Sequence, residues 1–142
     1  MGREDYPHRE LTRTIIGAAF EVSNTLGCGF LEKVYENALA AELRSRGLRV
    51  VQQMPVRVIY KETTVGDYVA DMIVEATVLI ETKATPEHNA IYGAQVLNYL
   101  KATQLPVGLL VNFGRPRLDV RRYILCKRLQ RDADETEEWM RE

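Results

Sequence analysis

Residues 67–84 read DYVADMIVEATVLIETKA, two apolar runs that carry the acids Asp71 and Glu81 and end at Lys83. Runs of β-branched and apolar residues separated by a short polar turn are typical of two strands joined in a hairpin. The second run is continuously apolar up to Glu81, which predicts a strand buried on both faces. We therefore expect the charged side chains of Glu81 and Lys83 to lie at the end of a buried strand.

The register of this hairpin decides where the charges lie. If residues 75–77 form the loop, Val74 pairs with Val78, and counting outward places Asp71 directly opposite Glu81. Directly opposed residues have Cβ atoms about 5 Å apart. A register changed by one residue would place the two acids on different faces of the sheet.

Two facing carboxylates suit Mg²⁺ or Mn²⁺, which prefer oxygen ligands. Lys83 lies two residues after Glu81 and therefore shares its face of the strand. It could orient an attacking water or stabilise charge that develops on a phosphate. The sequence thus predicts metal ligands Asp71 and Glu81 and a catalytic Lys83 for phosphodiester cleavage. The alternative is a surface hairpin whose alternating charges simply meet solvent.

Two helices are predicted before this hairpin. Apolar residues recur at spacings of three and four between Leu11 and Leu26, which indicates an amphipathic helix, and Gly27 and Gly29 interrupt it. The same periodicity predicts a second helix over residues 30–46.

The second helix carries a candidate acid. We expect Glu32 to be a catalytic acid and further metal ligand, Tyr35 one helical step away to contact substrate, and Glu36 to extend the acidic edge. The alternative for Glu32 is a first-turn glutamate that complements the helix dipole.

The remaining chain completes a mixed sheet. Residues 48–54 and 56–60 read as strands separated by Pro55, residues 90–103 as a helix, and residues 107–113 and 118–126 as strands, with a short helix from Lys127. A strand–helix–strand succession implies parallel neighbours. The predicted order is α-α-β-β-β-β-α-β-β, an α/β fold (an α+β mixed sheet flanked by helices).

Gln95 and Tyr99 lie four residues apart and so share one face of the predicted helix. We expect Gln95 to complete the catalytic group and Tyr99 to hold substrate. The alternative is that Gln95 caps a sheet edge and Tyr99 belongs to the core.

The net charge of −1 hides a basic segment next to an acidic end. Between residues 115 and 131 only Asp119 opposes the cations, whereas residues 132–142 hold six acids and Arg141. We expect the basic segment to contact phosphates, through Arg115, Arg117, Arg121 and Arg122. The alternative is a solvated strand edge.

The length of 142 residues suits one domain. We expect an N-terminal tail at 1–10, a single domain at 11–131 and an acidic C-terminal tail at 132–142. Cys28 and Cys126 lie outside any CxxC pattern, and no segment is typical of a signal peptide or a membrane span. A cytoplasmic protein with no membrane partner is expected.

Several motifs, in order, resemble the GxxExxY protein family. They are GFLEKVY at 29–35, AD at 70–71, ETK at 81–83, AQ at 94–95, NYL at 98–100 and GLLVNFG at 108–114. The similarity runs from about Leu11 to Leu125. One departure is Tyr92, where we would expect histidine in this family.

That family looks like a branch of the PD-(D/E)XK nuclease-like superfamily. The resemblance implies a restriction-endonuclease-like core in which Asp71, Glu81 and Lys83 form the site and Glu32 adds an acid from the preceding helix. Gln95 and Tyr99 match the QxxxY element of RecB-like nucleases, in which the glutamine supports the active site.

We therefore expect a Mg²⁺- or Mn²⁺-dependent nuclease that acts on nucleic acid, DNA rather than RNA. The alternative is a catalytically silent nuclease-like module that binds nucleic acid or a protein. The sequence leaves a homo-oligomer or a protein partner open.

Overall fold

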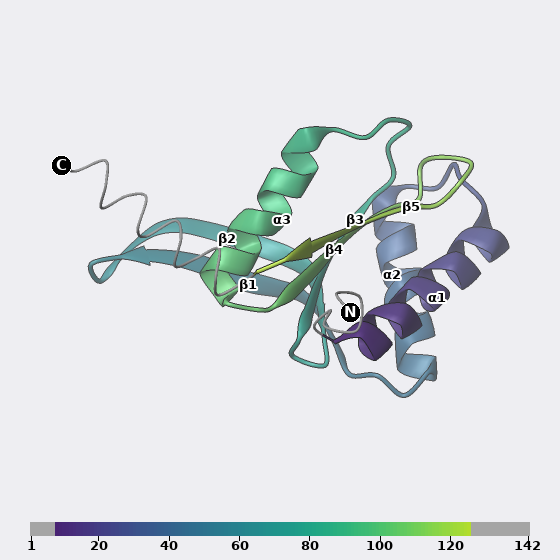
Figure 1. Ribbon diagram of the computed structural model, residues 1–142. Coiled ribbons are helices and arrows are strands. Elements are labelled where there is room, and N and C mark those ends of the chain that lie inside the picture. Colours follow the sequence, from purple (N-terminus) through teal and green to yellow (C-terminus); the bar gives the residue numbers. More distant parts are fainter. Residues whose placement is uncertain (1–7, 126–142) are drawn as a thin grey trace, which may run out of the picture.

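The computed structural model describes residues 8–125, which form three helices and one five-stranded sheet (Figure 1). The elements are α1 (Arg9–Leu26), α2 (Glu32–Ser45), β1 (Val50–Tyr60), β2 (Thr63–Val74), β3 (Val78–Lys83), α3 (Ala90–Thr103), β4 (Val107–Asn112) and β5 (Asp119–Ile124). The predicted helix from Lys127 and the acidic tail at 132–142 lie outside the described residues. The first helix begins at Arg9, inside the predicted 1–10 tail.

The sheet is mixed, with the strand order β1-β2-β3-β4-β5. Neighbouring strands are antiparallel except β3 and β4, which are parallel and joined by α3. A crossover helix is the usual way to join parallel strands. The predicted α/β mixed sheet with flanking helices is confirmed.

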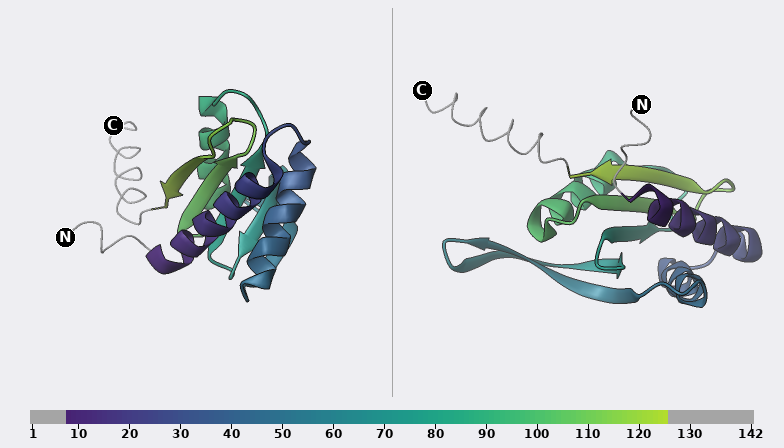
Figure 2. Two further views of the ribbon diagram at one scale, coloured as in Figure 1. Left: turned by 90° about the vertical axis from the view of Figure 1, so that its right-hand side faces the viewer. Right: turned by 60° about the horizontal axis from the view of Figure 1, so that its bottom comes forward.

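The helices cover both faces of the sheet (Figure 2). One core joins α1 and α2 to the sheet and includes Ile15, Leu39, Met72, Ile80 and Leu109. A second core joins α3 to the opposite face and includes Leu79, Val96, Leu100 and Leu110. The central strands β3 and β4 are therefore buried on both sides, as their continuous apolar runs predict.

The prediction of two strands interrupted by Pro55 is wrong. Pro55 lies inside the single strand β1, in register with Val69 of β2. β1 is an edge strand, so the missing N–H of a proline removes no hydrogen bond from a neighbour on its open side. The observed order is consequently α-α-β-β-β-α-β-β.

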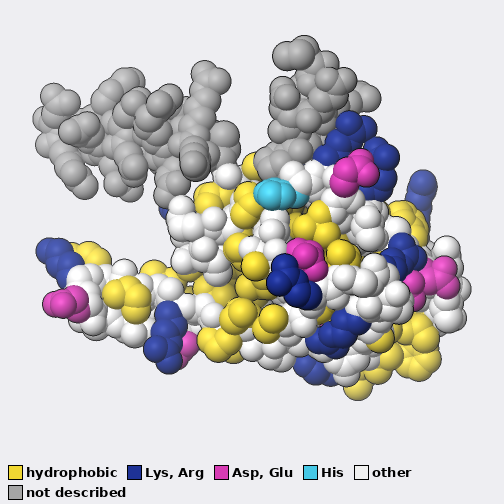
Figure 3. Space-filling view, turned by 90° about the horizontal axis from the view of Figure 1, so that it is seen from below, with side chains coloured by type: hydrophobic (Ala, Val, Ile, Leu, Met, Phe, Trp, Pro, Cys, Tyr) yellow, Lys and Arg dark blue, Asp and Glu magenta, His cyan; other side chains and the backbone are white. Residues whose placement is uncertain are grey.

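β1 and β2 form a long hairpin that projects beyond the rest of the sheet (Figures 1 and 2). We call its outer part, residues 54–70, the hairpin arm. Hydrophobic and charged side chains are intermixed on the face of the arm that Figure 3 shows. The exposed apolar side chains of the arm include Ile59, Tyr60, Val65, Tyr68 and Val69.

None of the helices within residues 8–125 is long and apolar enough to cross a membrane. Cys28 is an exposed free thiol, and Cys126 lies outside the described residues.

Candidate active site

The hairpin of β2 and β3 has the predicted register. Val74 pairs with Val78 and Met72 with Ile80, and Glu75 and Ala76 adopt φ values of 53° and 51° in the turn. Positive φ at two successive turn residues matches the right-handed twist of a hairpin. Asp71 and Glu81 occupy the next step along the two strands.

At that step the side-chain carboxylates of the two acids accept hydrogen bonds from backbone N–H groups, in place of the backbone carbonyls of a regular sheet. The N–H of Asp71 donates to Oε2 of Glu81 at 2.8 Å. The N–H and the hydroxyl of Thr82 donate to Oδ2 of Asp71 at 2.7 and 2.8 Å. The regular pairing of β2 with β3 ends at Met72 and Ile80, and each strand then hydrogen-bonds to an acid of the other.

A change of face occurs at the same level in β1 and β2. In β2, Met72 packs against α1 and α2, whereas Ala70, two residues away, belongs to the core beneath α3. In β1, Val50 packs on the α1 and α2 side and Val56 on the α3 side, and the intervening Gln53 has φ of 55°. Strict alternation would keep each pair on one face. The irregularity turns the hairpin arm toward α3.

The pKa values of both acids are raised above their ordinary values. Burial, and after it the charge of Asp71, raises the pKa of Glu81 to about 8. Burial also raises the pKa of Asp71, although the hydrogen bonds from Thr82 oppose the rise. A like charge in a dry site disfavours ionisation, and a bound cation reverses that preference.

Glu32 lies at the first turn of α2 and interacts electrostatically with this pair. Burial raises the pKa of Glu32, the positive charge of Lys83 lowers it, and the charge of Asp71 raises it. The carboxylates of Glu32, Asp71 and Glu81 therefore lie close enough to Lys83 for its positive charge to lower the pKa of each of them.

Lys83 follows Glu81 on the face of the sheet that α3 covers. Its Nζ lies 4.7 Å from the ring centroid of Tyr92. Within residues 8–125 no carboxylate lies within ion-pair distance of this ammonium group. The aromatic ring holds the lysine while leaving its donors available.

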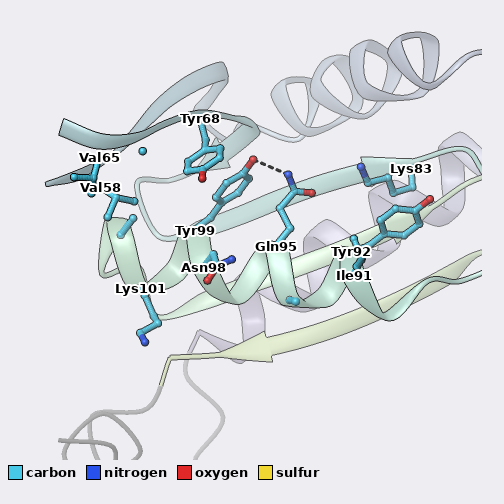
Figure 4. A pocket seen from close by; sticks show the side chains of 13 residues that line it. Val58, Val65, Tyr68, Lys83, Ile91, Tyr92, Gln95, Asn98, Tyr99 and Lys101 are labelled. Atoms are coloured by element: carbon cyan, nitrogen blue, oxygen red, sulfur yellow. Dashed lines mark hydrogen bonds between the residues drawn. The ribbon is translucent and has the colours of Figure 1, made fainter. Parts of the chain in front are cut away.

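Gln95 and Tyr99 meet on the inner face of α3, where Gln95 Nε2 donates to the Tyr99 hydroxyl at 2.8 Å (Figure 4). Tyr99 is only 4% exposed, and burial followed by the charge of Glu81 raises its pKa. Both side chains line an open groove that also contains Lys83. Tyr99 is thus part of the core and of the groove wall at once.

Glu36 is a fourth acid, on the same helix as Glu32, and the sequence predicted only that it extends the acidic edge of that helix. It is 2% exposed and accepts hydrogen bonds from Lys33, Gln52 and Gln53. These bonds fix the irregular segment of β1 to α2. Its position four residues after Glu32 on one helix was the available signal.

Tyr35 has a structural role in place of the predicted substrate contact. It is fully buried, its ring stacks on Phe113 with centroids 4.8 Å apart, and its hydroxyl donates to the carbonyl of Gly27. The hydroxyl also accepts from the N–H of Phe30 at 3.2 Å. A side chain with no exposed surface cannot reach a ligand.

The four predicted arginines do not form one surface. Arg115 and Arg121 both bind Asp119, at 3.2 and 3.3 Å, and Arg117 lies in the same depression. Arg121 pairs with Leu110 and so shares the α3 face with the acids, whereas Arg122 pairs with Leu109 on the opposite face. Arg122 is therefore misplaced for a shared phosphate contact.

The two carboxylates of Asp71 and Glu81 are the described side chains that fit a hard divalent cation. Among residues 8–125 no group of three or more His, Cys, Asp or Glu side chains is arranged to hold a metal. Asp71 Oδ1 and Glu81 Oε1 accept no hydrogen bond from the described residues, so each acid has an oxygen to offer. Mg²⁺ is commonly bound by one or two carboxylates with water and substrate oxygens as further ligands.

Comparison with known proteins agrees with this geometry. The family model described as "PD-(D/E)XK nuclease superfamily" matches residues 9–123, the helices and all five strands of the described fold. The chain belongs to the PD-(D/E)XK nuclease superfamily. Members of this superfamily generally use divalent metals and bind nucleic acid.

The solved structure titled "Crystal structure of SSO0001" is similar to the chain, with 16% identity and a TM-score of 0.46. The match covers 75% of this chain and 57% of that one. No curated protein is significantly similar in sequence.

Proposed function

We propose that the chain is a divalent-metal-dependent nuclease of the GxxExxY branch, which hydrolyses phosphodiester bonds in DNA in the cytoplasm. The observation that supports this most is the pair of carboxylates, Asp71 and Glu81, held between two diverging strands by backbone N–H groups. Lys83 stands beside them on the same face. Membership of the nuclease superfamily supports the same reaction.

In this proposal Asp71 and Glu81 would hold Mg²⁺ or Mn²⁺, with the carboxylate of Glu32 nearby on α2. When bound, the cation supplies Lewis-acid polarisation of the phosphodiester and an acidified water. The N–H groups of Asp71 and Thr82 fix the direction of both carboxylates before substrate arrives.

Lys83 donates hydrogen bonds to the attacking water or to the scissile phosphate and stabilises the charge that develops there. Tyr92 limits the positions of its ammonium group. Gln95 supports the site from α3, with its side chain oriented by Tyr99. Arg121, Arg115 and Arg117 contact the phosphate backbone farther along the same edge.

Cleavage of labelled single- and double-stranded DNA in Mg²⁺, Mn²⁺ and EDTA tests the proposal. We expect cleavage that needs the metal and is lost in Asp71→Asn and in Lys83→Ala. The matched controls are Asp67→Asn and Lys61→Ala on the exposed hairpin arm, which should cleave normally. Activity that persists in both site variants would overturn the assignment.

A binding module without turnover is the second candidate. Two observations favour it: residues 8–125 supply no third metal ligand in place at the site, and the pKa of Glu81 is raised to about 8. Such a module would bind nucleic acid or a protein partner, as a monomer or an oligomer, and leave oligonucleotides intact with every metal. Its binding to nucleic acid would weaken steeply with salt.

A further inference from the structure

An open groove of about 740 Å³ runs between the hairpin arm and α3 (Figure 4). One end contains Lys83 and Gln95 of the candidate active site, and the other end lies between Val58 and Val65 of the arm. The groove exists because β1 and β2 change faces at Gln53 and turn the arm toward α3. A strand that lies in the groove therefore reaches Lys83 and Gln95, the residues of the candidate active site that line it.

The walls of the groove are aromatic and apolar. Tyr68 from the arm faces Tyr99 from α3, with ring centroids 5.9 Å apart and planes at 46°, and Tyr92 lies beneath Lys83. Tyr68 is 49% exposed, so part of its ring is available to a ligand. Exposed rings beside a nuclease site are suited to stacking on unpaired bases.

The position of the Tyr68 ring depends on Gly66. A Cβ built on Gly66 would lie 2.8 Å from Cε2 of Tyr68, so any larger residue there would displace the ring. Glycine inside a strand otherwise weakens it and commonly marks a place where another group approaches closely. Gly66 thus keeps Tyr68 in the groove wall.

The polar groups of the groove are few and well placed for one strand. Lys83 stands at the inner end, and Lys101 and the exposed Asn98 lie along α3. The volume is that of a pocket for a small ligand, which suits a few nucleotides rather than a double helix. A duplex presents its phosphates outward and needs a basic surface, whereas this groove is mainly apolar.

We propose that this groove binds unpaired nucleotides, so that the substrate is single-stranded nucleic acid or a single-stranded end. The strand lies between the hairpin arm and α3, its bases stack on Tyr68, and its phosphates pass Lys101 on the way to Lys83. This proposal rests on the proposed nuclease function for its biological meaning, but the binding it describes is independent of cleavage.

Fluorescence anisotropy of the full chain with labelled oligonucleotides tests the groove, with Ca²⁺ as the cation and electrophoresis to confirm that the probes stay intact. The probes are single-stranded DNA, single-stranded RNA and a blunt DNA duplex. We expect at least one single strand to bind about tenfold or more tightly than the duplex. Tyr68→Ala should weaken that binding about tenfold, and Tyr68→Phe should preserve it.

The matched control is Tyr60→Ala, at the tip of the arm, where the ring contacts Lys61 and lies outside the groove. It should bind normally, and thermal melts should show all three variants folded. Lys101→Ala should reduce the slope of log K against log[salt] by about 0.7, the value for one phosphate contact on a single strand.

The outcomes separate the two proposals. Single-strand binding that depends on Tyr68 without cleavage in any metal supports the groove and overturns the nuclease. Equal affinity for duplex and single strands, or equal losses from Tyr60→Ala and Tyr68→Ala, overturns the groove. Metal-dependent cleavage together with single-strand affinity that is unchanged in Tyr68→Ala also overturns the groove and leaves the nuclease assignment standing.

Discussion

The backbone N–H of Asp71 donates a 2.8 Å hydrogen bond to the carboxylate of Glu81 on the neighbouring strand. A strand normally directs this N–H to a backbone carbonyl of its partner. Here a side-chain carboxylate accepts the hydrogen bond instead, and the backbone pairing of β2 with β3 is interrupted at the two acids. Fold and site therefore share a cause, because the interruption of β2–β3 pairing is made by the candidate ligands themselves.

The stability of the metal-free protein should fall as the pH rises from about 5 to 8. The folded-state pKa of Glu81 is about 8, above its ordinary value of 4.5, so folding favours the protonated acid. That contribution is complete below the unfolded pKa and is lost as the pH rises through the folded pKa. Melting temperatures in EDTA across this range measure it.

Two comparisons make the pH prediction specific. Glu81→Gln should flatten the dependence, because the amide does not titrate. Added Mg²⁺ should raise the melting temperature most near pH 8, where binding requires the least proton release. A wild-type profile that rises between pH 5 and 8 in EDTA would contradict the assignment of a buried, repelled Glu81.

Lys83→Ala should lower kcat by about 10²–10³-fold, the typical loss for one donor that stabilises charge in the transition state. Metal affinity should change little, because the ammonium group is not a ligand. Lys83→Arg should restore little activity if the position over Tyr92 matters, because the guanidinium fork is larger than the ammonium group. Single-turnover cleavage beside Mn²⁺ titration measures both effects, and a change confined to KM would indicate a binding role instead.

Glu36→Ala should weaken Mn²⁺ binding by about 10-fold or more, although Glu36 is not proposed as a ligand. Its carboxylate fixes Gln52 and Gln53 beside the interrupted strand, and outer partners of metal sites commonly have effects of this size. Glu42→Ala, which removes a half-buried acid that pairs with Arg46 at the other end of the same helix, is the control. Equal Mn²⁺ affinity in the two variants would show that the buried network has no influence on the site.

Tyr35→Phe should lower the free energy of unfolding by about 1–2 kcal/mol, because it removes the hydroxyl that bonds Gly27 and leaves the N–H of Phe30 without its acceptor. Cleavage per folded molecule should stay unchanged. Urea unfolding and cleavage assays distinguish this structural role from the substrate contact that the GxxExxY motif suggests. A loss of activity without a loss of stability would restore the substrate role.

Local patterns predicted most of the elements and the central part of the site. Helix α3 has the predicted bounds, Ala90–Thr103, and the β2–β3 register follows from the loop length at Glu75–Thr77. These features depend on neighbours in the sequence. Asp71 and Glu81 are only ten residues apart, so a hairpin suffices to bring them together.

Features that depend on distant segments were missed. Pro55 is tolerated because β1 happens to be an edge strand, and Gln53 takes φ of 55° because α2 and β2 hold it there. The burial of Tyr35 depends on Phe113, far away in the chain. Strand alternation separates Arg121 from Arg122, a consequence that charge counting along the sequence does not reveal.

The most direct measurement is a crystal structure of the chain soaked in Mn²⁺, with anomalous difference maps. We predict a peak bridging Asp71 Oδ1 and Glu81 Oε1, at about 2.0–2.3 Å from each oxygen. The same soak of Asp71→Asn should show no peak. Well-diffracting wild-type crystals at pH 8 with no Mn²⁺ between these two carboxylates, or with Mn²⁺ bound elsewhere, would contradict a shared cation site.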